Sequence, residues 1–288
     1  MKRNAIVRIV LWSIALVVLL GILLAGLYVP GALSRIRRES SGDHAEYQEM
    51  EGKGFTLDAA SVRDIEVEWA AGSIVIQPMD IAEIYIAEEG ANQSSNPMVW
   101  NVREGKLSIQ YCKEPARVFV FGMDVKLEDK NLIIQVPRSW QCNTLEIEAA
   151  SATLEVQDLT IRKVEFDGAS GTCDFRSCTV ETLDLDTASG DVRFTGSLQQ
   201  LDCDAASADI VLELTNVPRS LDMDTASGDL DVTLPEDAGF TVTLDAMSSD
   251  FESDFETTSR NGSHVAGNGR CHIDVDAMSG DVIIRKGA

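Results

Sequence analysis

Alternation of apolar and acidic residues is the strongest pattern along this chain. The run LDLDTASGDVRF at 183–194 is typical, and similar runs fill the chain from about residue 143 to its end. Successive side chains of a β-strand point to opposite faces, so this alternation predicts short strands with one buried and one polar face. After residue 40 no segment keeps the apolar spacing of a helix. The pattern therefore predicts an all-β fold.

A short phrase of small residues recurs between the alternating runs. DTASGD occurs at 186–191 and again at 224–229, and looser copies surround both. Aligned on the central serine, the copies are 19, 19, 18, 20, 21 and 31 residues apart. The serines are Ser151, Ser170, Ser189, Ser207, Ser227, Ser248 and Ser279. Such spacing indicates a repeat in which every unit makes the same tight bend, and a catalytic serine would stand alone.

The repeat places apolar residues in fixed columns around each serine. The positions six and four residues before it, and three and five after it, are apolar in every copy except at Ser253. One unit cannot bury such faces alone, whereas stacked units can. An antiparallel sandwich would also alternate but would not need the same bend at nearly constant spacing. We expect a parallel β-solenoid with coils of about 19–20 residues.

Three longer motifs carry a resemblance to a known family. LDLDTASGDVRF, LDMDTASGDLDV and GNGRCHIDVDAMSGDVIIR resemble the bacterial β-strand-repeat family labelled “putative adhesin”, a domain of unknown function. The likeness covers roughly residues 55–288, and LIIQVPRSW at 132–140 resembles the strand that leads into the family's repeats. The resemblance implies a right-handed parallel β-solenoid (β-helix) outside the cytoplasm. Members are often membrane-anchored envelope proteins, some encoded beside envelope-stress regulators, and the resemblance transfers no active residues.

The N-terminus carries an uncharged apolar run, IVLWSIALVVLLGILLAGLYV, at 9–29. This length spans a bilayer as a helix, whereas the apolar region of a cleaved signal peptide is shorter. We therefore expect residues 1–33 to form a cytoplasmic tip and a transmembrane helix. Basic residues flank both ends, Lys2 and Arg8 before the span and Arg35 after it. We favour a single-pass cell-membrane protein whose C-terminal domain is extracytoplasmic.

The remaining boundaries follow from breaks in the repeat. Residues 34–54 are polar and predict a linker, and 55–142 predict an irregular first coil, with Ala71 near the bend, and a strand-rich cap. Residues 143–288 predict the regular β-solenoid. Its last, longer step contains Asn261 and Gly262, a hairpin signal, so we expect a hairpin insertion near 252–272 that projects from the stack.

The charge balance limits the partners. The chain has 24 Lys and Arg against 47 Asp and Glu, a net charge of −23, which disfavours nucleic acid and favours cations or cationic peptides. Columns of acidic residues flank each bend, so solvent, backbone N–H groups or Ca²⁺ must offset their repulsion. The Ca²⁺ candidates are Asp186, Asp191, Asp204, Asp209, Asp224 and Asp229.

The cysteines and histidines give weaker signals. The six cysteines match no zinc spacing, and Cys173 and Cys203 fall in inward columns, so we expect free buried thiols. A Cys173–Cys178 bridge is the alternative. His264 and His272 could approach each other across the predicted hairpin, near Cys271, but an exposed loop is the simpler interpretation.

The sequence contains no signature of catalysis or of a cofactor site, so we do not expect an enzyme. We expect a membrane-anchored, non-catalytic, adhesin-like binding protein or envelope-stress accessory protein. Its partner would be an envelope protein, a cationic peptide or a cell-wall ligand. The alternatives are passive structural display, a Ca²⁺-stabilised adhesin and, with the least support, a polysaccharide-active β-helix enzyme.

Overall fold

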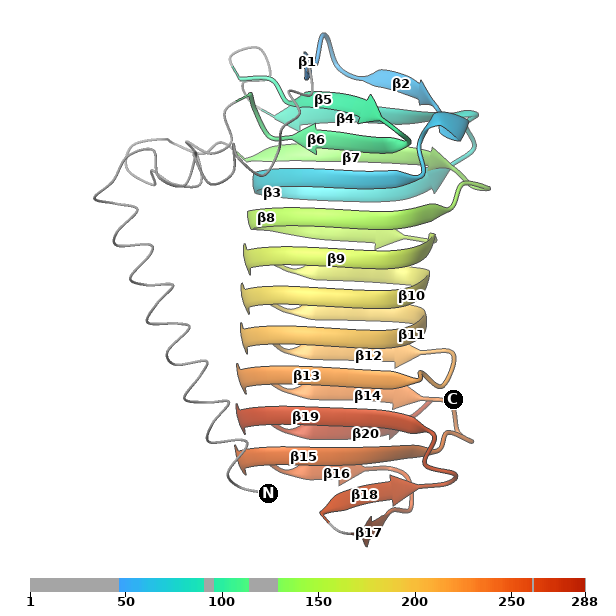
Figure 1. The fold of residues 1–288 in the computed structure, drawn as a ribbon, viewed down its shortest axis with the longest axis vertical. Helices are drawn as coiled ribbons and strands as arrows, with labels where there is room; N and C mark the ends of the chain where they lie inside the picture. The colour runs from blue at the N-terminus through green and yellow to red at the C-terminus, as the bar shows by residue number, and fades with distance from the viewer. Residues whose placement is uncertain (1–46, 91–95, 114–128, 261, 288) are drawn as a thin grey trace, which may run out of the picture. The chain divides into compact units, whose positions relative to one another are not determined.

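The computed structural model describes residues 47–90, 96–113, 129–260 and 262–287, which form β-strands and one short 3₁₀-helix (Figure 1). The predicted transmembrane span at 9–29 and most of the predicted linker lie outside the described residues. Within the described ranges no helix has the length and apolar character needed to cross a membrane.

The elements follow one another with short connections. The first are β1 (Gln48–Glu49), β2 (Phe55–Asp58), the 3₁₀-helix η1 (Ala59–Ser61), β3 (Asp64–Met79), β4 (Glu83–Gly90), β5 (Val99–Arg103), β6 (Lys106–Gln110) and β7 (Lys130–Pro137). The repeat region contains β8 (Cys142–Gln157), β9 (Thr160–Ser170), β10 (Cys173–Ser189), β11 (Val192–Ser207), β12 (Ile210–Leu214), β13 (Ser220–Ser227) and β14 (Leu230–Leu234). The last are β15 (Phe240–Ser248), β16 (Phe251–Ser253), β17 (Thr258–Arg260), β18 (Ser263–Ala266), β19 (Cys271–Ser279) and β20 (Val282–Lys286).

The repeats stack in parallel register, as the columns predict. Leu183 lies beside Leu201, which lies beside Leu221, and the serines at the bend are register partners in the same way. We call the strand segments before the bend the first ladder, those after it the second ladder, and the bend itself the corner. The prediction of an all-β, largely parallel stack is confirmed.

The core lies between the two ladders. Inward residues of the first ladder, such as Leu185, and of the second, such as Phe194, are almost fully buried. Rings also stack between neighbouring coils, and the centroids of Phe175 and Phe194 are 5.9 Å apart. The one polar inward position, Ser253, belongs to β16 in the outermost C-terminal coil, where less of the stack remains to be covered.

The corner brings successive coils together at backbone distance. Gly190 has φ +142°, and a Cβ atom built there would lie 1.9 Å from the carbonyl oxygen of Gly171 in the preceding coil. Gly228 and Gly280 face their neighbours in the same way. The phrase therefore recurs because each coil needs a residue without a side chain where it crosses its neighbour.

The order of the coils in space differs from their order in the chain at the C-terminal end. β19 pairs with β13 on one side and β15 on the other, while β20 lies between β14 and β16 (Figure 1). The last coil of the chain is thus inserted between two coils that precede it. Sequence spacing alone suggested simple succession.

The N-terminal end has the same device. β3 forms the first coil, and Ala71 pairs with Ser151, so its predicted place at the corner is confirmed. However, β6 and β7, which follow β3 in the chain, lie on its outer side and pair with it in parallel. Both terminal coils of the chain therefore have a neighbour on each side.

Antiparallel strands cover the outer coils. At the N-terminal end β5 pairs with β6 and β4 with β7, and β1 and β2 extend this layer. At the other end the hairpin β17–β18 pairs with β15 through β18. The predicted hairpin therefore exists, but it continues the first ladder rather than projecting from it. Covering strands of this kind protect edges that would otherwise pair with other chains.

The inserted order gives a direct prediction. Asp222 and Asp274 are register partners on β13 and β19, so the double variant Asp222→Cys/Asp274→Cys should form a disulfide under mild oxidation. The readout is the mobility of the denatured, unreduced chain on a gel.

The control pairs the same β13 position with β15. Asp222→Cys/Thr243→Cys should stay reduced, because β19 separates the two strands and places the Cα atoms about 9–10 Å apart, beyond disulfide reach. Cross-linking of the control pair but not the first pair would mean that the coils stack in chain order.

The corner gives a second prediction. Gly190→Ala should lower the free energy of unfolding by roughly 2–4 kcal/mol, because the new methyl group meets a backbone carbonyl and the φ value is strained. Gly52→Ala is the control, since Gly52 also has a positive φ but has no neighbouring atom within 4 Å of the added carbon. Its cost should be only about 1–2 kcal/mol in the same denaturant titration.

Candidate ligand-binding face

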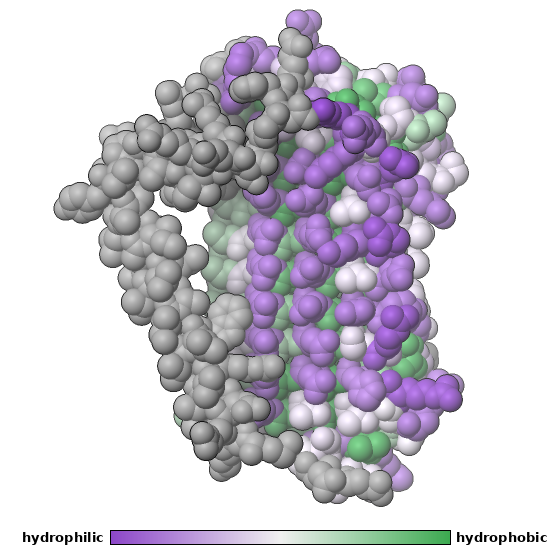
Figure 2. Space-filling view, in the orientation of Figure 1, coloured by the Kyte–Doolittle hydropathy of each residue, from purple (hydrophilic) through white to green (hydrophobic). Residues whose placement is uncertain are grey.

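The outward side of the first ladder carries two columns of carboxylates, which we call the acidic face. They lie five and three residues before each corner serine, and Figure 2 shows hydrophilic residues in columns running across the strands. The outer column contains Glu66, Glu146, Glu165, Asp184, Asp202, Asp222 and Asp274. The inner column contains Glu68, Glu148, Asp167, Asp186, Asp204, Asp224, Asp276 and Asp245.

The two columns raise one another's proton affinity. The pKa of Asp204 is above its ordinary value because of partial burial and then the charges of Asp224 and Asp186. Burial, followed by the charges of Asp274 and Asp202, raises the pKa of Asp222 in the same way. Carboxylates at strand spacing repel one another, so the ionised face costs the folded state free energy.

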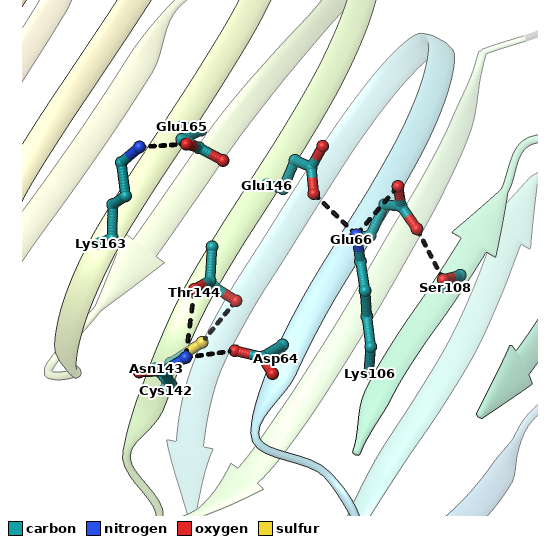
Figure 3. A network of polar contacts seen from close by, with 10 residues as sticks. All are labelled: Asp64, Glu66, Lys106, Ser108, Cys142, Asn143, Thr144, Glu146, Lys163 and Glu165. Atoms are coloured by element: carbon teal, nitrogen blue, oxygen red, sulfur yellow. Dashed lines mark hydrogen bonds and ion pairs between the residues drawn. The ribbon is translucent and has the colours of Figure 1, made fainter. Parts of the chain in front are cut away.

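Lysine side chains bridge the carboxylates near the N-terminal end of this face (Figure 3). The Lys106 Nζ lies 3.1 Å from Glu66 and 2.8 Å from Glu146, which are register partners on β3 and β8. Burial lowers the pKa of Lys106, but its hydrogen bonds to Glu146 and Glu66 outweigh this and raise it overall. A single ammonium group thus joins two adjacent coils.

Lys163 repeats this arrangement two coils further on. It forms ion pairs with Glu165 and, at 3.6 Å, with Asp184 of the next coil. The hydrogen bond to Glu165 is the main cause of its raised pKa. The next coils carry Thr182, Gln200 and Ser220 in the register position of Lys163. Lysine bridges of this kind therefore belong to the N-terminal half of the face.

A separate acidic column at the corner is neutralised by the backbone. The carboxylate of Asp209 accepts a hydrogen bond from the N–H of Asp229 at 3.0 Å, and that of Asp229 accepts one from Asp281 at 2.8 Å. Asp281 in turn accepts one from the N–H of Asp250 at 2.9 Å. Each bond joins two coils, so these aspartates hold the stack together.

The six Ca²⁺ candidates divide between these two places. Asp186, Asp204 and Asp224 lie on the acidic face, whereas Asp191, Asp209 and Asp229 lie beyond the corner in the second ladder. Two of the corner carboxylates already accept backbone N–H groups. In the part of the chain that the structure describes, no three His, Cys, Asp or Glu side chains form a group able to hold a metal ion. The role of Ca²⁺ stays a prediction.

The cysteines are all buried and free, as the sequence predicts. They are Cys112, Cys142, Cys173, Cys178, Cys203 and Cys271, and none forms a disulfide. Burial raises the pKa of Cys142 and Cys203 to about 12 and that of Cys178 to about 11. They therefore behave as small apolar core residues with little thiolate at neutral pH.

A buried ion pair closes the N-terminal layer. The Lys130 Nζ lies 3.4 Å from Glu88, donates a hydrogen bond to the carbonyl of Tyr111 at 2.8 Å, and lies 4.2 Å from the centroid of its ring. The Glu88 side chain is fully buried. This cluster joins β4, β6 and β7 where the regular repeat is absent, and sequence periodicity gave no sign of it.

These features identify the family. The model of the Toastrack DUF4097 family matches residues 62–285, and the chain belongs to this family. No curated protein matches the chain.

Three solved structures are similar in part. A “putative cell adhesion protein” from Clostridium sporogenes matches with 7% identity and a TM-score of 0.40, over 84% of this chain and 100% of that one. A “putative adhesin” from Bacteroides fragilis matches with 14% identity and a TM-score of 0.41, over 82% and 98%. A “putative lipid binding protein” from Parabacteroides distasonis has 15% identity and a TM-score of 0.27, over 84% and 96%.

The electrostatics of the acidic face predict a pH-dependent gain. Asp204→Asn should raise the free energy of unfolding at pH 7 by a few tenths to about 1 kcal/mol, since solvent screens this half-exposed group. The folded pKa of Asp204 lies above the ordinary 3.8, so its charge weakens the fold as pH rises through that interval. The gain should therefore disappear below about pH 3.8, where both states are protonated.

The matched control is Asp237→Asn, in the exposed turn between β14 and β15, which removes the same charge away from the acidic columns. Denaturant titrations at several pH values compare the two. A gain of equal size in the control would assign the effect to net charge rather than to the acidic face.

Proposed function

We propose that this chain is a membrane-anchored, extracytoplasmic and non-catalytic binding protein of the cell envelope. Its right-handed β-solenoid presents the acidic face to a cationic partner, such as a lysine-rich segment of an envelope protein. The stack itself is adhesin-like in family and rigid in construction, and it acts by display rather than by chemistry.

The acidic face is the observation that carries this proposal. From β11 onwards the outer column continues through Asp202, Asp222 and Asp274 while the lysine bridges lie on earlier coils. Lys106 and Lys163 demonstrate the binding mode, since each ammonium group is seated between carboxylates of adjacent coils. A partner that supplies ammonium groups would relieve the same repulsion further along the ladder.

The location rests on a separate observation. The uncharged run at 9–29 is long enough to span a membrane, and the polar residues after it allow the domain to stand clear of the surface. Family membership supports an envelope role without naming a ligand.

The test uses the full chain in bacterial cells whose wall has been removed. A fluorescent lysine-rich peptide should bind these cells, and binding should fall steeply with salt because it depends on exposed charges. Asp202→Asn/Asp204→Asn/Asp222→Asn should reduce the affinity several-fold. Protease added before the peptide should digest the domain and abolish binding.

The control variant is Glu236→Gln/Asp237→Asn/Glu252→Gln, which removes the same charge at exposed sites away from the acidic face and should bind like the parent. Protection from protease until lysis would show that the domain is cytoplasmic. Digestion without peptide binding, or an equal loss in both triple variants, would leave the location intact and overturn the cationic partner.

A further inference from the structure

A pair of exposed methionines stands out on the surface of the described residues. Met247 is 78% exposed and Met278 is 47% exposed, and the only other exposed large apolar side chain in that part of the chain is Met79 at 38%. Both occupy the position directly before the corner serine, Met247 in β15 and Met278 in β19.

Register places the two methionines side by side. Ala246 pairs with Ala277 and Ser248 with Ser279, so the residues between them lie at the same level of adjacent strands. Neighbouring strands are about 4.8 Å apart. The other repeats carry alanine at this position, at Ala150, Ala169, Ala188, Ala206 and Ala226. The pair is therefore a local change in an otherwise small and uniform column.

Two thioethers at this spacing have a specific coordination chemistry. Metal–sulfur bonds in proteins are about 2.3 Å long, so a cation held between two opposed sulfur atoms spans about 4.6 Å, close to the strand spacing. Thioether ligands select soft cations, and Cu(I) leads among the first-row metals. The unbranched methionine side chain has enough rotatable bonds to bring each sulfur inward.

We propose that Met247 and Met278 form a surface site for a soft monovalent cation, Cu(I) or Ag(I). The site lies at the corner of the two outermost C-terminal coils and is independent of the cationic-partner proposal. Asp245 and Asp276 lie two residues earlier on the same strands, and their charges raise the local concentration of cations. Carboxylates are hard ligands, so the two sulfur atoms supply the selectivity.

The buried cysteines are the natural competitors for such a cation. Cys271 is the nearest of them in sequence, and it is fully buried with its pKa raised to about 12 by burial. A folded chain thus offers its thioethers at the surface and its thiols only on opening. The experiment must therefore read out the methionines themselves.

The test is a titration of the full chain, in detergent micelles and with ¹³C-labelled methionine methyl groups, with silver nitrate followed by NMR. The methyl signals of Met247 and Met278 should shift together and saturate. Met79, a lone exposed methionine, is the internal control and should not follow them. Potassium nitrate at the same concentration should produce no shift.

Single variants separate a two-ligand site from weak binding to any exposed thioether. Met278→Leu should reduce the silver response of Met247 at least tenfold in apparent affinity, and Met247→Leu should do the same to Met278, while Met79→Leu leaves both unchanged. Leucine is similar in volume, and both sites are exposed, so the fold is preserved. Shifts no larger than that of Met79, or an unaltered response in either single variant, would overturn the proposal.

Discussion

The close stacking of corner on corner is the constraint on which this structure depends. Gly190 crosses Gly171 so tightly that no side chain fits, and the same crossing recurs at Gly228 and Gly280. This contact fixes each coil against its neighbour at one point, and the pleat then fixes every residue on either side. The columns of the core, the corner aspartates and the acidic face all inherit their alignment from it.

Fixed register explains how much of the fold the sequence predicts. Because the corner phrase marks one point in each coil, alternation assigns every neighbouring residue to the inside or the outside. The predicted columns, the corner at Ala71 and the free buried cysteines are confirmed for this reason. The acidic columns were also foreseen, since they follow from the same alignment.

The order of the terminal coils could not be predicted in this way. β19 presents the same pattern to β13 as β15 would, with leucine, isoleucine or valine inward and aspartate outward, so local pattern favours neither arrangement. The choice depends on the hairpin β17–β18, which pairs with β15 and covers its outer edge. Likewise the bridge from Lys106 was not predicted, because β6 lies outside the repeat and its register depends on β3.

The swapped ends and the repulsive face are connected by the same physical argument. A stack of parallel coils is weakest at its last coil, which has a neighbour on one side only, and column repulsion adds to that weakness. Inserting the terminal coil secures the end of the chain, while the carboxylate of Asp229 bonds the inserted coil through the N–H of Asp281. Asp281 then bonds Asp250 of the outermost coil. The corner column thus uses its carboxylates to join coils across the inserted one, which allows the acidic face to remain charged for a partner.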